Sequence, residues 1–294
     1  MAKIIITGGT GLVGKRLTDL LVNRNHEVRI LSRNPQTPNE YKWDPSSNKI
    51  DEKSLVDVEY IIHLAGAGIA DKRWTSERKK IIIESRVATA NLIFSKIKEL
   101  QIPLKGFISA SGSNFYGAKT GATIYAETDK AGTDFLGNVC LQWEKAATQF
   151  ETLQIPVTIL RTGIVLSQKG GALDKMKTPI VSPLGSGKQY LSWIHLDDLC
   201  QMYISAIEHN FCGIYNAVAP EFHTSTSFSK LLAQKIHRPF LPISVPGILL
   251  KLVFGELAII LLEGSRLSSK KILKDGFQFQ YKTLSKALDQ LFQK

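Results

Sequence analysis

Short apolar runs alternate with longer segments of helical periodicity over the first 165 residues of the chain. Continuous apolar runs of this length are typical of strands that are buried on both faces of a parallel sheet. They predict strands at 4–6, 27–31, 60–64, 106–109 and 157–161, and helices at 15–23, 78–100 and 138–153. This alternation indicates an α/β fold with a doubly wound parallel sheet of the Rossmann type.

The first strand leads directly into a glycine-rich loop that a helix follows. In the pattern T-G-x-x-G-x-x-G, the first glycine permits a tight turn, the second lets the backbone approach a pyrophosphate, and the third allows close packing of helix and strand. The helix N-terminus supplies free N–H groups to the pyrophosphate. The predicted dinucleotide-binding residues here are Thr7, Gly8, Gly9, Thr10, Gly11, Leu12, Val13 and Gly14.

The end of the second strand indicates which dinucleotide binds. A site selective for NAD places a carboxylate there to accept the ribose 2′-hydroxyl, about 20 residues after the glycines. This chain has Ser32 and Arg33 instead, and Arg33 follows Gly14 by 19 positions. Because a guanidinium can hold a 2′-phosphate through two parallel hydrogen bonds, we predict NADP(H) rather than NAD(H). The alternative is a solvated arginine at a strand end.

Two stretches interrupt the regular pattern. Residues 35–49 are polar and predict a loop, and no third strand is evident there. After about residue 165 the pattern becomes irregular, so we divide the chain into a Rossmann domain at 1–165 and a smaller C-terminal α/β lobe at 166–294. We expect this lobe to cover the substrate and to interleave with the first domain. Lys251 and Glu256 interrupt the apolar segment 245–262, which favours a buried helix pair over a membrane span.

Composition and charge narrow the class of protein. The chain has 294 residues, 44% of them hydrophobic, and a net charge of +11. The basic residues are scattered and no nucleic-acid-binding motif is present, so the charge is better explained by anionic phosphates than by nucleic acid. Three widely spaced cysteines form neither a disulfide framework nor a metal site, and no signal peptide is evident. We therefore expect a cytoplasmic protein without a metal ion.

Motifs after later strands carry a resemblance to a known family. Leu64-Ala65-Gly66, Tyr116-Gly117 and Arg161-Thr162-Gly163 resemble the extended short-chain dehydrogenases/reductases. The segments 70–75, 143–144, 161–166, 192–199, 261–264 and 276–277 are similar to an atypical branch, the epimerase family with a C-terminal region of the DUF1731 type. This resemblance implies a Rossmann-type fold, NADP binding and nucleotide-sugar-epimerase ancestry. It places Leu64, Ala65 and Gly66 at the cofactor. Arg161 ends a strand on the cofactor side, so we expect it to contact the phosphate or ribose, with a buried ion pair as the alternative.

The resemblance also exposes a difference at the expected active site. Extended reductases act through Tyr-x-x-x-Lys on one helix face, where the tyrosine exchanges a proton with the substrate oxygen. Here Cys140 and Glu144 occupy the two positions. Three interpretations stay open. Glu144 accepts from ribose hydroxyls while Cys140 or a nearby hydroxyl is the acid; or Ser111, Ser113 or Tyr116 is the catalytic group; or the fold keeps its cofactor without standard catalysis.

Four further side chains are candidates for the substrate site. Trp74 and Trp193 offer apolar walls for a ring, with core packing as the alternative. Lys188 follows a flexible glycine loop and would meet an anionic group. His195 precedes Asp197 in an expected hydrogen-bonded cluster, either as an acid–base group or as a structural histidine.

Two functions remain in view from these residues. The first is an NADP(H)-dependent oxidoreductase or epimerase-like enzyme acting on a small anionic or sugar-like molecule, with no membrane and no nucleic-acid partner. The second is a non-catalytic NADP(H)-binding sensor or scaffold that docks a partner. The sequence leaves the oligomeric state open, with a homodimer as one option.

Overall fold

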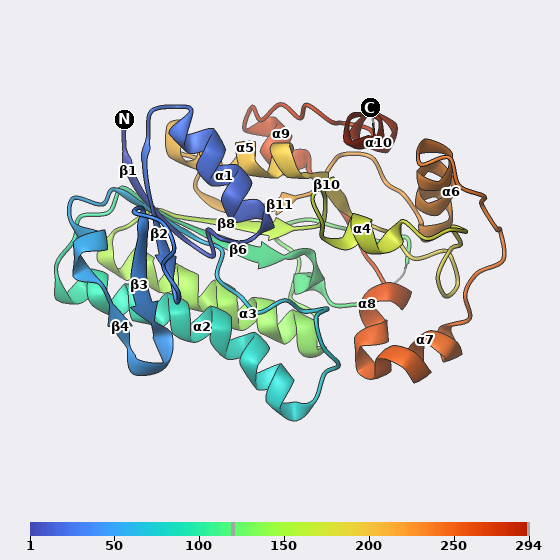
Figure 1. Ribbon diagram of the computed structural model, residues 1–294, viewed down its shortest axis with the longest axis horizontal. Helices are drawn as coiled ribbons and strands as arrows, with labels where there is room; N and C mark the ends of the chain where they lie inside the picture. Colours follow the sequence, from blue (N-terminus) through green and yellow to red (C-terminus); the bar gives the residue numbers. More distant parts are fainter. Residues whose placement is uncertain (119–120, 293–294) are drawn as a thin grey trace.

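The computed structural model describes residues 1–118 and 121–292 and is built around one large sheet (Figure 1). Its strand order is β11-β8-β6-β5-β1-β2-β3-β4, and all neighbours are parallel except β3 and β4. The strands are β1 Lys3–Thr7, β2 Glu27–Ser32, β3 Glu40–Asp44, β4 Lys49–Ile50, β5 Tyr60–His63, β6 Gly106–Gly112, β8 Val157–Thr162 and β11 Gly213–Ala217. The prediction of an α/β protein with a Rossmann-type parallel sheet is confirmed.

Helices cover both faces of this sheet (Figure 1). The α-helices are α1 Leu12–Val22, α2 Ser76–Glu99, α3 Phe135–Thr148, α4 Ala172–Met176, α5 Leu196–Glu208, α6 Ser225–Lys235, α7 Gly247–Phe254, α8 Ile259–Leu262, α9 Lys270–Lys274 and α10 Leu284–Phe292. The 3₁₀ turns are η1 Pro45–Ser47, η2 Glu52–Leu55, η3 Ser113–Tyr116, η4 Gln149–Leu153 and η5 Gly255–Ala258. Small strands β7 Ile124–Tyr125 and β12 Arg266–Leu267 pair in parallel, as do β9 Ile164–Leu166 and β10 Trp193–His195.

The apolar run of the first strand is buried on both faces, as its composition predicts. Ile4 and Ile6 belong to the core shared with α1 and α5, whereas Ile5 belongs to the opposite core shared with α2 and α3. All three side chains are fully buried. Successive side chains of a strand point to opposite faces, so one short run supports two hydrophobic layers.

The loop predicted at 35–49 is wrong, because β3 lies in this segment and β4 begins at its last residue. Only Trp43 is buried in β3, while its other positions are partly or fully exposed. β3 lies near the edge of the sheet, where most of a strand faces solvent and its apolar pattern is weak. This explains why the sequence pattern did not reveal it.

Part of the chain after residue 165 also belongs to the large sheet. Residues of β11 pair with β8, and α5 packs on α1. Arg16 of α1 and Asp197 of α5 form an ion pair at 2.7 Å. The remaining C-terminal elements have their own core, built around residues such as Trp193, Phe228 and Leu288. Residues 166–294 therefore contribute both to the sheet and to a second cluster of helices.

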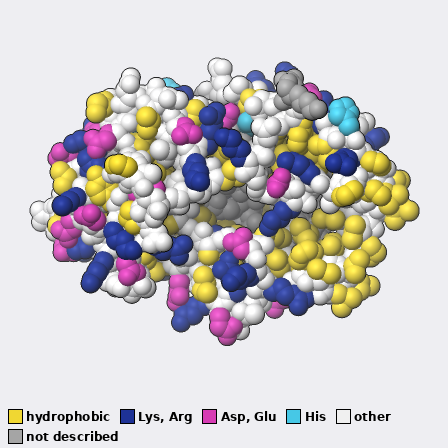
Figure 2. All heavy atoms as spheres, viewed as in Figure 1, with side chains coloured by type: hydrophobic (Ala, Val, Ile, Leu, Met, Phe, Trp, Pro, Cys, Tyr) yellow, Lys and Arg dark blue, Asp and Glu magenta, His cyan; other side chains and the backbone are white. Residues whose placement is uncertain are grey.

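The segment 245–262 forms α7, η5 and α8, but the prediction that it is a buried helix pair is wrong. Leu250 is the buried position of α7, whereas Ile248 and Leu252 are 77% and 71% exposed. Figure 2 shows an apolar surface in the region of α7 and α8. The apolar side chains of α7 point in several directions, and a helix this short can turn only one face to the protein. Among the described residues, no helix has the length and apolar character that crossing a membrane requires.

Candidate cofactor and active site

The glycine loop between β1 and α1 has the geometry of an anion site. Gly8 adopts φ +70°, a conformation that L side chains rarely take. A Cβ on Gly14 would lie 2.4 Å from the Gly8 carbonyl oxygen, so only glycine allows the helix to pack on the loop. The helix begins after Gly11 without a side-chain cap, which leaves the first N–H groups of α1, including those of Leu12 and Val13, available for a ligand.

The loop after β5 lies directly beside this glycine loop. Thr7 Oγ1 accepts hydrogen bonds from the backbone N–H groups of Leu64 and Ala65, at 3.2 and 3.1 Å. A Cβ on Gly8 would come within 2.9 Å of the Leu64 carbonyl group. Thr7 is itself fully buried, so its side chain positions the two loops and does not face the solvent. The predicted contacts of these loops with a cofactor stay predictions.

Two cationic residues lie at the end of β2. The Arg33 side chain is exposed, and its guanidinium has no hydrogen-bond or ionic partner among residues 1–118 and 121–292. Lys42, on the neighbouring strand β3, donates from Nζ to the Arg33 carbonyl oxygen. Ser32 is buried and accepts a hydrogen bond from the Asn34 N–H. Lys42 was missed because the sequence pattern did not reveal β3.

A buried cation supports the loop after β5. Arg86 of α2 donates from Nη2 to the Ala67 carbonyl oxygen at 3.1 Å, and its guanidinium lies over the Trp143 ring. A Cβ on Gly66 would lie 2.9 Å from Arg86 Cζ, so the backbone lies flat against the guanidinium. Burial lowers the pKa of Arg86 to about 10, and no carboxylate of the described residues pairs with it. No motif in the sequence singled out this residue.

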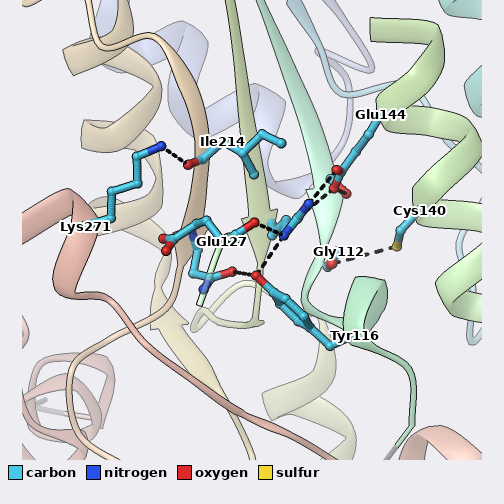
Figure 3. Close-up of polar contacts among 10 residues, drawn as sticks. Gly112, Tyr116, Glu127, Cys140, Glu144, Ile214 and Lys271 are labelled. Atoms are coloured by element: carbon cyan, nitrogen blue, oxygen red, sulfur yellow. Dashed lines mark hydrogen bonds and ion pairs between the residues drawn. The ribbon is translucent and has the colours of Figure 1, made fainter. Parts of the chain in front are cut away.

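A second buried group joins α3 to β8 (Figure 3). Arg161 donates from Nε and Nη2 to the two carboxylate oxygens of Glu144, at 2.9 and 2.8 Å. Its Nη1 donates to the Tyr116 hydroxyl at 2.8 Å, and that hydroxyl donates to Asn216 Oδ1 at 2.7 Å. Ser111 Oγ donates to Glu144 Oε1 at 2.7 Å. These polar groups satisfy one another inside the protein.

This buried group corrects four predictions. Glu144 is 6% exposed and already accepts hydrogen bonds from Arg161 and Ser111, so it is not placed to accept from ribose hydroxyls. The cofactor contact predicted for Arg161 is wrong, since the residue is 2% exposed and forms the alternative buried ion pair. Ser111 and Tyr116 are buried too, and burial raises the pKa of Tyr116 to about 12. Neither hydroxyl is placed to serve as the catalytic group.

Cys140 is also a packing residue. Its Sγ lies 3.7 Å from the Gly112 carbonyl oxygen, beneath the end of β6. Burial, with a smaller effect of the Glu144 carboxylate, raises the pKa of the thiol to about 11. Because Cys140 is 4% exposed, its thiol is not placed to give a proton to a substrate, and the alternative of a small buried apolar side chain holds.

Ser113 is the predicted catalytic residue that stays accessible. It begins η3 at the carboxyl end of β6 and is partly exposed. Its Oγ has no hydrogen-bond partner within the described ranges. Ligands bind beyond the carboxyl ends of the strands in this kind of sheet. A catalytic role for Ser113 stays a prediction.

The four predicted substrate residues divide into two groups. Trp193 is fully buried in the core of the C-terminal helices, so its role as a substrate wall is wrong. His195 is 2% exposed and caps α5, since its Nδ1 accepts from the Asp197 N–H at 3.1 Å; its substrate role is wrong as well. Trp74 is partly exposed and lines a cavity, whereas Lys188 lies exposed on a loop outside it. Both of these predictions stay open.

The chain is similar to known proteins along its whole length. Residues 4–217 match the NAD dependent epimerase/dehydratase family, and residues 245–291 match a domain of unknown function, DUF1731. An epimerase family protein of Mycobacterium bovis is 34% identical over 98% of this chain and 96% of its own. One from Staphylococcus aureus is 34% identical over 100% of both chains. The crystal structure of human epimerase family protein SDR39U1 (isoform 2) with NADPH superposes with a TM-score of 0.87, at 30% identity and 98% coverage of each chain.

Proposed function

Since the chain belongs to the NAD dependent epimerase/dehydratase family, we propose that it binds NADP(H) and moves hydride to or from a carbonyl or alcohol carbon of a small molecule. The glycine loop fits such a cofactor, because the uncapped start of α1 offers N–H groups to a pyrophosphate. The similar human protein was crystallised with NADPH.

The single observation that carries the choice of NADP(H) is the pair of cations at the end of β2. Arg33 lies where the second strand ends, Lys42 Nζ donates to its carbonyl oxygen, and no carboxylate of the described residues pairs with either side chain. A ribose 2′-hydroxyl would need an acceptor at this point, whereas a 2′-phosphate needs positive charge. The guanidinium of Arg33 is free to provide it.

Different residues of this chain would then bind the cofactor and orient the substrate. The first turn of α1 donates backbone hydrogen bonds to the pyrophosphate, and Thr7 holds the loop after β5 against the glycine loop. Ser113 Oγ donates a hydrogen bond to the reacting oxygen of the substrate, which orients it and supports the charge that develops there. Solvent supplies the proton that completes the alcohol, or takes up the proton when an alcohol is oxidised. When bound, NADPH supplies the hydride.

The experiment that tests the proposal uses NADPH carrying deuterium at nicotinamide C4, incubated with the protein and an extract of small metabolites. We expect one metabolite to gain deuterium, as read by mass spectrometry, and this gain to disappear in a boiled sample. Tight NADPH binding without any deuterated metabolite contradicts the reductase function. A repeat with NADP⁺ and a search for epimerised products then tests an epimerase that returns the hydride to the same carbon.

A second candidate function is a non-catalytic NADP(H) sensor that docks a partner. The buried positions of Cys140 and Glu144 favour it, because they replace the tyrosine and lysine with which extended reductases catalyse. The matched variant Ser113→Ala separates the two functions. Loss of deuterium transfer at unchanged NADPH affinity supports the enzyme, whereas no transfer by either protein supports the sensor.

A further inference from the structure

Arg86 of α2 is a buried cation without an ionic partner in the part of the chain that the structure describes. The residue is 6% exposed, and its Nε atom has no hydrogen-bond partner there. Nη1 donates to the Ile82 carbonyl oxygen at 2.8 Å, and Nη2 donates to the Ala67 carbonyl oxygen at 3.1 Å. Both acceptors are neutral. A charge in such a place costs free energy unless an opposite charge comes near it.

The carboxylates on the surrounding elements do not compensate this charge. Glu144 of α3 is paired with Arg161. In the loop after β5, Asp71 is exposed, and its Oδ2 lies 3.7 Å from Arg78 Nη2. Water screens exposed charges, so such groups offset little of a buried one. The carboxylates of α2 itself are all on exposed residues, namely Glu77, Glu84 and Glu99.

One glycine separates this cation from the surface of the loop after β5. A Cβ on Gly66 would lie 2.9 Å from Arg86 Cζ, 3.1 Å from Nη2 and 3.2 Å from Nε, so the flat guanidinium lies against the glycine backbone. Gly66 itself is exposed. Through Leu64, the same loop contacts the glycine loop at Gly8. A ligand that lies across the two loops therefore feels the positive charge of Arg86.

The charge of Arg86 also acts at the carboxyl end of β6, where the proposed reacting site lies. Burial raises the pKa of the Cys140 thiol to about 11, and the charge of Arg86 acts on that pKa in the opposite direction. Cys140 Sγ lies 3.7 Å from the Gly112 carbonyl oxygen, and Ser113 is the next residue of the chain. The thiol is neutral at pH 7, so it does not compensate the guanidinium.

We propose that Arg86 is a specificity-determining residue that makes the protein bind NADPH more tightly than NADP⁺. The inference rests on the proposed function and adds the redox state in which the cofactor is preferred. Both forms carry the same phosphates, but the nicotinamide ring is neutral when reduced and has one positive charge when oxidised. Because Arg86 is not compensated, it repels the oxidised ring alone. The preference suits a reductase, which has to take up NADPH and release NADP⁺.

The size of this preference follows from Coulomb's law. At an effective dielectric constant of about 20, one unit charge changes the ratio of the two dissociation constants about fivefold or more if the ring lies within about 15 Å. Attraction of the cofactor phosphates to other cations affects both forms equally and cancels in the ratio. The ratio therefore isolates the effect of charge on the nicotinamide ring.

Calorimetric titrations with NADPH and with NADP⁺, in a buffer of low ionic strength where screening is weak, test the inference. Arg86→Gln removes the charge but can still donate to the Ala67 carbonyl oxygen, and it should lower the preference for NADPH about fivefold or more. Arg86→Lys keeps the charge and should keep the preference. Lys80→Met is the matched control, because it removes an exposed charge from the same helix and should leave the ratio unchanged.

Circular dichroism first shows that each variant folds, and Arg86→Met, whose apolar side chain suits a buried position, replaces Arg86→Gln if that variant does not fold. An unchanged ratio in the neutral variant overturns the inference even if both affinities fall, because Arg86 would then only support the loop. An equal loss of preference in Arg86→Lys overturns it too, since the charge would not be the cause.

The deuterium experiment separates this inference from the proposed function. A preference for NADPH that depends on the charge of Arg86, without any deuterium transfer, supports the inference and removes the oxidoreductase function. Deuterium transfer with a ratio that Arg86→Gln does not change does the reverse. Failure of the unaltered protein to bind either form of the cofactor removes both.

Discussion

Replacing Glu144 with alanine should destabilise the protein strongly and leave its cofactor affinity unchanged. Glu144 receives two hydrogen bonds from Arg161 inside the protein, where Arg161 is 2% exposed. Removing one partner of a buried ion pair costs about 3–5 kcal/mol, because the other charge is left without compensation. Arg161 would keep its hydrogen bonds to the Tyr116 hydroxyl and the Glu127 carbonyl oxygen. We therefore expect a cost at the lower end of this range, about 3 kcal/mol.

The hydroxyl of Ser111 adds to this cost. It donates to Glu144 in the intact protein and would lose that acceptor while buried, which costs about 1 kcal/mol more. The total loss in the free energy of unfolding is therefore about 4 kcal/mol. In a chain of this size, each kcal/mol lost from the free energy of unfolding lowers the melting temperature by about 2 °C. The melting temperature should therefore fall by about 8 °C.

Urea unfolding followed by circular dichroism at pH 7 measures this loss, and calorimetric titration of NADPH measures affinity. The double variant Glu144→Leu with Arg161→Met is the control, because it removes both charges and should recover most of the stability. A loss below about 1 kcal/mol in the single variant would refute the argument from burial. A tenfold loss of NADPH affinity without a change in stability would indicate that Glu144 contacts the cofactor.

Other predictions concern single groups. Arg33→Asp should weaken NADPH binding by about tenfold to a hundredfold without weakening NADH binding, as measured by calorimetry, because one charge-assisted pair contributes about 1.5–3 kcal/mol; equal effects on both cofactors would contradict it. His195→Ala should lower stability by about 1 kcal/mol, as loss of a helix cap does, at unchanged NADPH affinity. Burial lowers the pKa of His63 to about 3. The unfolded chain, but not the native one, therefore takes up this proton as the pH falls below about 6.5, and stability should decrease by up to about 1.4 kcal/mol per pH unit toward pH 3. Urea titrations from pH 7 to pH 5 check this, and a flat profile contradicts it. Exposed Cys212 should react rapidly with a thiol reagent at pH 8, whereas buried Cys140, with its pKa raised to about 11, should react at the rate of unfolding; Cys212→Ser should abolish the fast phase.

The sequence predicted the parts of the fold in which local pattern and burial coincide. The central strand at 4–6 has three consecutive apolar residues because both of its faces are covered. The glycine loop could also be predicted, because each glycine is required by a local steric constraint. By contrast, β3 buries little apart from Trp43, so its pattern resembles that of a loop. Apolar residues in α7 predicted burial, but composition alone does not say which face of a short helix meets the protein.

The sequence singles out candidate site residues where a local pattern fixes their position, and it misses residues whose position depends on distant partners. Arg33 follows a strand at a fixed distance from the glycines, so spacing alone singles it out, and its contact with the cofactor stays a prediction. The pairing of Glu144 with Arg161 joins a helix to a strand 17 residues later, and no periodicity reports such a contact. Arg86 could have been noticed as a cation on the inner face of a long helix, but its contact with Ala67 depends on how that helix lies on the sheet.

Because β11 is the edge strand, its partner β8 has an unpaired edge until β11 has been synthesised. The strand it pairs with, β8, ends at Thr162, and β11 ends at Ala217, 55 residues later. Ribosomes add about 5–20 residues per second, so about 3–11 s pass between the two. Through that interval the nascent chain carries an open strand edge that can pair with other chains. Translation slowed while β8 is outside the ribosome and β11 is still inside should therefore increase aggregation of the newborn protein, whereas the same delay after β11 has emerged should not.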